Sequence, residues 1–278
     1  MSRWPSRTTR HHLASRIAGL AFLAGVIFIL LPARHEALAQ ATPAESAASE
    51  SAAPETPPKP SKHLDLRRMT PVTGSAQAGK ARADELCSIC HGAHGIANAP
   101  LFPSLAPQSA EYLYWELVEY KRGARPESPM APLTDDLTDQ DMRDLAVFYA
   151  GLKPTAADVI AAVGEPEAKP DPELLARGKS LFLAGDPGKG IPPCQACHGA
   201  DARGHPLARV ANRDGHLPYA AYPALRAQHD VYLQARLGAY RDGLLKDSSN
   251  DRIMSGVAER LDEDSIQAIS AWLSSLQP

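Results

Sequence analysis

The chain has 278 residues, which is enough for two small domains but too few for a large enzyme joined to a carrier. Only 6% of the residues are aromatic, so the cores must be small or filled by another group. The formal net charge of −3 becomes −7 if residues 1–39, which hold five Arg and one Glu, are removed. This negative balance argues against nucleic acid as a partner and favours docking on proteins with basic patches.

The first 39 residues have the layout of a secretory signal peptide. A basic leader precedes an apolar run of fifteen residues over 17–31, and Ala37 and Ala39 form a small-x-small site before Gln40. An uncleaved anchor is the alternative, although the run is shorter than the ~20 residues that a spanning helix needs. We therefore predict export to the periplasm, with tethering to the inner membrane only if the leader is retained.

A disordered linker is predicted over residues 40–73. Its first part, 40–62, consists largely of Ala, Pro, Ser and Glu and has almost no large apolar side chains. Such a stretch cannot bury enough surface to offset the entropy lost on ordering.

The rest of the chain contains two copies of one pattern, which indicates two domains of the same kind. A Cys-x-x-Cys-His motif begins at Cys87 and again at Cys194, 107 positions later. A Pro-x-Leu segment at Pro103 recurs 120 positions later, and the segment around Met130 recurs 124 positions later. The second copy therefore has extra residues before Pro223, in loop-like sequence where insertions are tolerated.

Both copies are predicted to be helical. Ser109 can cap a helix that runs to Arg122, and Thr138 with Asp141 forms a capping-box pattern before the next apolar face, on which Met142 is expected to be buried in the core. Because no strand alternation is convincing, we expect an all-α fold of two tandem helical bundles with long ordered loops. The predicted boundaries are 74–153 for the first domain, 154–170 for a connector and 171–278 for the second domain.

The Cys-x-x-Cys-His motif is the attachment signature of c-type haem. Cysteines at i and i+3 share one face of a helical turn, so their sulfurs can join one porphyrin while the next histidine binds its iron. Two covalently bound haems c are predicted, with His91 and His198 as metal ligands. The attachment residues are Cys87, Cys90, Cys194 and Cys197. A four-cysteine zinc site or a redox dithiol is the alternative, disfavoured because each pair is followed by His within its own repeat.

The second axial ligand of each iron is predicted to be a methionine. Met130 and Met254 occupy matched positions in the two copies, in Pro-flanked or polar segments expected to be loops. The alternative is that they only fill gaps in the packing. Four histidines compete for the role, but none has a histidine at the matching position of the other copy. They are His94, His205, His216 and His229.

Taken together, these segments resemble the cytochrome c4 family of di-haem class I c-type cytochromes. The resemblance covers roughly residues 74–276 and rests on the two motifs, the two Pro-x-Leu segments and the Met-to-helix segments. It implies that the carbonyls of Pro103 and Pro223 accept a hydrogen bond from the Nδ1–H of His91 and His198, which would orient each ring and make it more basic.

An electron carrier is the function that this pattern favours, because an iron with two protein ligands has no open position for substrate. The expected partners are redox proteins, with single electrons passing from respiratory or dehydrogenase complexes to a terminal acceptor. The alternatives are an electron-transfer subunit of a membrane dehydrogenase or oxidase complex, or a di-haem enzyme such as a peroxidase or thiosulfate-oxidising cytochrome.

The longer loop of the second copy carries basic residues, which suggests unequal haems. If the loop lies over one haem edge, its positive charge raises that haem's potential. The residues concerned are His205, Arg209, Arg213 and His216.

Overall fold

A computed structural model describes residues 65–164 and 171–278. The predicted leader, residues 40–64 of the predicted linker and residues 165–170 of the connector lie outside these ranges. In the described residues the secondary structure is helical, apart from one isolated antiparallel bridge between Asp186 and Ile191. The expected all-α class is therefore confirmed. Within the same ranges no single helix is long and apolar enough to cross a membrane.

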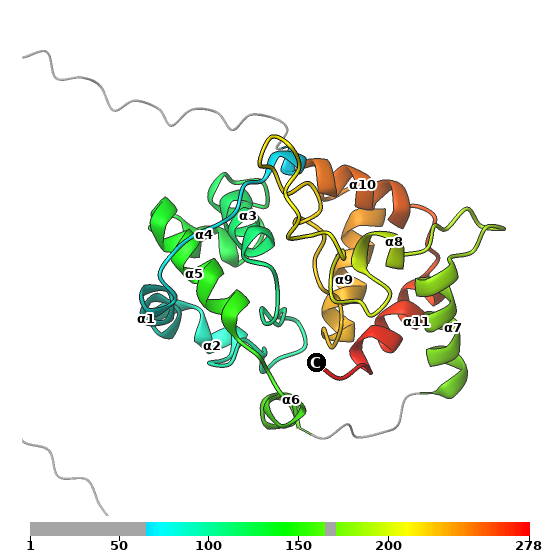
Figure 1. Cartoon of the computed structure of the whole chain (residues 1–278). Coiled ribbons are helices and arrows are strands. Elements are labelled where there is room, and N and C mark those ends of the chain that lie inside the picture. The colour runs from blue at the N-terminus through cyan, green and yellow to red at the C-terminus, as the bar shows by residue number, and fades with distance from the viewer. Residues whose placement is uncertain (1–64, 165–170) are drawn as a thin grey trace, which may run out of the picture. The chain divides into compact units, whose positions relative to one another are not determined.

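The first domain contains five helices after a short 3-10 turn, η1 (Leu66–Arg68) (Figure 1). They are α1 (Ala76–Leu86), α2 (Ser88–His91), α3 (Ala110–Lys121), α4 (Met130–Thr134) and α5 (Asp139–Gly151). Ser109 caps α3 by accepting a hydrogen bond from the Tyr112 backbone, and Thr138 forms the predicted capping box with Asp141 at the start of α5.

The second domain repeats this order from α7 onward. Its helices are α7 (Pro172–Ala184), α8 (Gln195–His198), α9 (Asp230–Arg241), α10 (Ser249–Ala258) and α11 (Glu263–Ser274). The connector predicted at 154–170 contains a further helix, α6 (Ala156–Val163), which begins at a capping box of Thr155 and Asp158. The capping box and the Ala residues that follow it favour this helix, which was not among the predicted elements.

The first and last helices of each domain pack against each other, α1 on α5 and α7 on α11 (Figure 1). In both pairs the helices approach most closely at a glycine. A Cβ on Gly79 of α1 would lie 2.0 Å from the Asp144 carbonyl oxygen of α5, and one on Gly178 of α7 would lie 1.9 Å from the Ala268 carbonyl oxygen of α11. Any side chain at these positions would push the helices apart. The matched glycines thus set the close helix crossing that frames each domain.

Each domain has its own apolar core. Leu145 and Phe148 of α5 pack with Leu113 of α3 in the first domain, and Met142 is buried there, as its helical position predicted. In the second domain Phe182, Trp272, Ile266 and Leu273 are central, and the Phe182 and Trp272 rings lie 4.9 Å apart.

The segment before the first domain is ordered where the structure describes it. Leu66 and Met69 are buried against three residues of the second domain's insertion and the following turn, together with the ring of Trp115 in α3. The three residues are Leu217, Ala220 and Ala221. The Leu217 amide also donates to the Met69 carbonyl oxygen over 2.7 Å. Residues 65–73 were predicted to belong to the disordered linker, but they pack against the second domain. The reason is that Leu66 and Met69 are buried by residues that lie far away in the sequence.

Candidate functional site

One buried histidine stands at the end of a short helix in each domain. His91 ends α2 and His198 ends α8, with 4% and 6% of their surface exposed. Their Nδ1 atoms lie 2.8 Å and 2.9 Å from the carbonyl oxygens of Pro103 and Pro223. Because a carbonyl oxygen can only accept, Nδ1 carries the proton in each ring and Nε2 presents its lone pair. Both rings are thus oriented as metal ligands would be.

The chain turns sharply after each histidine. Gly92 and Gly199 have φ of +72° and +76°, and a Cβ on Gly92 would lie 2.0 Å from the Ile96 carbonyl oxygen. This turn is what brings Pro103 back to His91, since the loop folds over the end of α2. The position after each Cys-x-x-Cys-His motif therefore requires glycine, because a side chain there would clash with the backbone of the returning loop.

Free cysteines lie beside each histidine. All four are half-buried and none forms a disulfide. Burial raises the pKa of Cys87 and of Cys194 to about 11 each, which keeps both thiols protonated at neutral pH, unlike a reactive dithiol. In the part of the chain that the structure describes, no three His, Cys, Asp or Glu side chains gather as a metal site. Paired free thiols beside an oriented imidazole fit covalent haem attachment.

An aromatic ring accompanies each histidine, which the sequence analysis missed. The Phe102 ring lies 6.3 Å from that of His91, and the Tyr222 ring lies 6.5 Å from that of His198. The two aromatics immediately precede Pro103 and Pro223, so the 120-residue offset that matches the prolines could have revealed them.

Met130 and Met254 are both half-buried, but neither lies in a loop. Met130 begins α4, and Met254 lies in the middle of α10. The loop prediction is wrong because Ser248 and Asp251 form a capping box that starts α10 ahead of Met254. Met130 and Met254, which match in the sequence repeat, nevertheless occupy equivalent places in the fold. Each lies on the helix that precedes the last helix of its domain.

Three of the four competing histidines have other contacts or lie at the surface, and the fourth, His216, is half-buried in the insertion. His205 stacks on Tyr219, with ring centroids 4.1 Å apart and an interplanar angle of 15°. His229 places Nε2 3.1 Å from the Ala97 carbonyl oxygen in the other domain. His94 is exposed.

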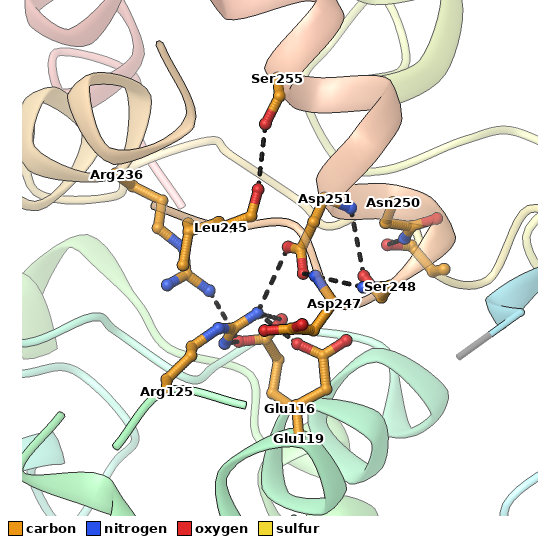
Figure 2. Close-up of polar contacts among 11 residues, drawn as sticks. Glu116, Glu119, Arg125, Arg236, Leu245, Asp247, Ser248, Asn250, Asp251 and Ser255 are labelled. Atoms are coloured by element: carbon orange, nitrogen blue, oxygen red, sulfur yellow. Dashed lines mark hydrogen bonds and ion pairs between the residues drawn. The ribbon is translucent and has the colours of Figure 1, made fainter. Parts of the chain in front are cut away.

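A buried cluster of charges joins the two domains (Figure 2). Arg125 lies 2.5 Å from both Glu116 and Glu119 and 3.6 Å from Asp251, while Arg236 of α9 donates to Glu116 over 2.9 Å. Three carboxylates thus share two guanidinium groups. Burial raises the pKa of Glu119 to about 7, whereas for Glu116 the charges of Arg125 and Arg236 outweigh burial and lower the pKa.

Two helical bundles, each with an oriented histidine beside a Cys-x-x-Cys pair, define the class of di-haem c-type cytochromes that transfer electrons. The family "Cytochrome c" matches residues 175–277, and "Cytochrome C oxidase, cbb3-type, subunit III" matches residues 74–148. Cytochrome c4 of Thiocapsa roseopersicina is 36% identical over 74% of this chain and 95% of its own length. This chain belongs to the cytochrome c4 family.

Other relatives agree with this assignment. The crystal structure of reduced recombinant cytochrome c4 from Pseudomonas stutzeri has a TM-score of 0.58 and 31% identity, covering 73% of this chain and all of its own. A protein of Thiomonas intermedia named "Thiosulfate dehydrogenase electron acceptor" is 34% identical over 68% of this chain and 77% of its own length. The chain is therefore an electron carrier of two tandem class I cytochrome c domains with two covalently bound haems c, as predicted.

Proposed function

We propose that this chain carries single electrons in the periplasm, from a respiratory or dehydrogenase complex to a terminal acceptor. The observation that supports the proposal most is the fixed orientation of both buried histidines, each held through Nδ1 by a proline carbonyl. When bound, the haem iron supplies the one-electron redox change. His91 with Met130 would hold one iron and His198 with Met254 the other, and the four cysteines would hold the porphyrins.

This ligand set suits a carrier better than an enzyme. Two protein ligands on each iron leave no position for a substrate, and a methionine ligand raises the reduction potential. The proline carbonyls keep each imidazole in place, so its position changes little when an electron arrives or leaves.

A dehydrogenase is the electron donor that the names of some relatives favour. Two of them, from Thiomonas intermedia and Stutzerimonas stutzeri, carry the name "Thiosulfate dehydrogenase electron acceptor". The test mixes the oxidised holoprotein with a catalytic amount of thiosulfate dehydrogenase and thiosulfate, and follows haem reduction optically. Reduction that needs the dehydrogenase supports the proposal, and sulfate in place of thiosulfate is the matched control. Reduction by thiosulfate without the dehydrogenase would contradict it, because the chain would then be an enzyme.

Export is tested separately at the N-terminus. The Ala-x-Ala site predicts that the mature chain begins at Gln40. Terminal sequencing of protein released from the periplasm should find this residue first, whereas retention of residues 1–39 in the membrane fraction would favour the tethered form.

A further inference from the structure

Two glutamines connect the domains through matched hydrogen bonds. Gln228 of the second domain accepts from the Ser104 amide and donates to the Ser104 carbonyl oxygen, over 2.9 Å in each case. Gln108 of the first domain accepts from the Ala224 amide over 3.0 Å and donates to the Ala224 carbonyl oxygen over 2.6 Å. Both glutamines are buried, with 6% and 9% of their surface exposed. Gln108 and Gln228 are 120 positions apart, as are Ser104 and Ala224, so the contact is nearly symmetric.

The peptide group that each glutamine binds is the one that holds a haem-ligand histidine. In the peptide between Pro103 and Ser104, the carbonyl accepts from His91 and the N–H donates to Gln228. A continuous chain of hydrogen bonds therefore runs from a glutamine of the second domain, through one peptide plane, to the imidazole of the first.

The other domain repeats the arrangement in reverse. The carbonyl of Pro223 accepts from His198, and the N–H of the same peptide, which belongs to Ala224, donates to Gln108. Each histidine is thus linked to a side chain of the opposite domain and not of its own.

Hydrogen bonds in such a chain strengthen one another. An acceptor on the N–H side of a peptide draws the proton toward itself and leaves more negative charge on the carbonyl oxygen. A stronger carbonyl acceptor makes the imidazole that donates to it a more basic ligand, which favours the oxidised, more positive iron. Loss of the acceptor should therefore raise the reduction potential of the haem that the histidine holds.

We propose that Gln228 is a positioning residue for the haem of the first domain, and Gln108 for the haem of the second. This inference rests on the proposed role of His91 and His198 as iron ligands. It predicts a crossed effect: a substitution in one domain changes the haem potential of the other. A contribution to packing alone would act on the residue's own domain, or on both domains alike.

The experiment uses the holoprotein and the variants Gln228→Met and Gln108→Met, which keep the side-chain length but remove both hydrogen bonds. NMR signals of the haem methyl groups, assigned to each domain, are followed through a redox titration. For Gln228→Met the potential of the first haem should rise, with a clearly smaller change at the second haem. For Gln108→Met the larger rise should be at the second haem.

A matched control is His229→Leu, which removes the cross-domain bond to Ala97 but leaves both peptide–glutamine bonds in place. It should show no such crossed shift. If a methionine variant does not accumulate with two haems, Gln228→Asn and Gln108→Asn shorten the side chain and should give the same crossed pattern. A shift confined to the substituted domain, equal shifts at both haems, or no shift would overturn the inference.

Failure of this inference is distinguishable from failure of the ligand assignment. If His91 or His198 does not bind iron, the wild-type spectra will lack low-spin, histidine-ligated haem in that domain before any glutamine is changed. If those spectra are present and the crossed shift is absent, only the role of the glutamines is wrong.

Discussion

Relative to the wild type, the free energy of unfolding of the variant Glu119→Gln should increase as the pH rises. Glu119 is buried and shares Arg125 with two other carboxylates, and its pKa is raised from 4.5 to about 7. The folded state therefore holds the proton more tightly than the unfolded state. The stability of the native protein falls as the pH rises through the window from about 4.5 to about 7, and the neutral amide avoids this loss.

The magnitude follows from the shift of the pKa. Each pKa unit corresponds to about 1.4 kcal/mol, and between pH 5 and pH 8 the linkage amounts to about 2.5 kcal/mol. Relative to the wild type, the free energy of unfolding of Glu119→Gln should therefore rise by about that amount between pH 5 and pH 8. Any constant cost of the amide cancels in this comparison. Urea unfolding of the holoprotein, followed by far-UV circular dichroism, measures the difference at each pH.

Glu116→Gln is the control from the same cluster. The pKa of Glu116 is lowered, so its contribution to stability is fully present above its unfolded pKa and is lost only as the pH falls below about 4.5. This variant should be less stable than the wild type at pH 5. Because the Glu116 charge contributes to the raised pKa of Glu119, the difference should change with pH between 5 and 8, but by less than for Glu119→Gln. A pH-independent difference for Glu119→Gln would refute the argument, because it would show that the carboxyl ionises normally.

Four further substitutions, one of them with a control, test the packing and the ligands. Gly178→Ala would place a Cβ 1.9 Å from a carbonyl oxygen of α11 and should lower the free energy of unfolding by several kcal/mol, whereas Gly256→Ala, in open space on α10, should not lower it. Met69→Ala removes a side chain that is 1% exposed; it should cost about 2–5 kcal/mol of local packing and speed tryptic cleavage within η1. Met130→His and Met254→His should each abolish the weak sulfur-to-iron absorption of one haem and lower its potential; unchanged spectra would make the methionines packing residues.

The sequence was sufficient for features that depend on neighbouring residues or on the repeat. The cap at Ser109, the capping box at Thr138 and the buried position of Met142 follow from local rules, and the structure confirms them. The repeat offsets located the two histidines and the two prolines as matched residues, and the family resemblance implied the hydrogen bonds between them, which the structure confirms.

Contacts between the domains could not be predicted in this way. Gln108 and Gln228 were visible as matched residues, but nothing in a linear pattern shows that each binds the backbone of the opposite copy. The same limit explains the segment at Leu66 and Met69, whose partner surface lies about 150 residues away in the chain.

The sequence predicted the composition of the insertion before Pro223 but not its packing. Its loop-like composition was evident, and the structure shows that it packs against the segment before the first domain. Arg209 and Arg213 of the insertion are exposed. That the loop makes the two haem potentials unequal stays a prediction, and a variant with the loop shortened to the length in the first domain would test it.

A coulometric redox titration of the purified holoprotein, with optical spectra taken at each step, tests the central claim most directly. An electron carrier with two His/Met haems should take up two electrons per chain, and its oxidised form should be low-spin with the sulfur-to-iron absorption of both haems. Uptake of one electron per chain, or a high-spin haem with an open axial position, would contradict the account.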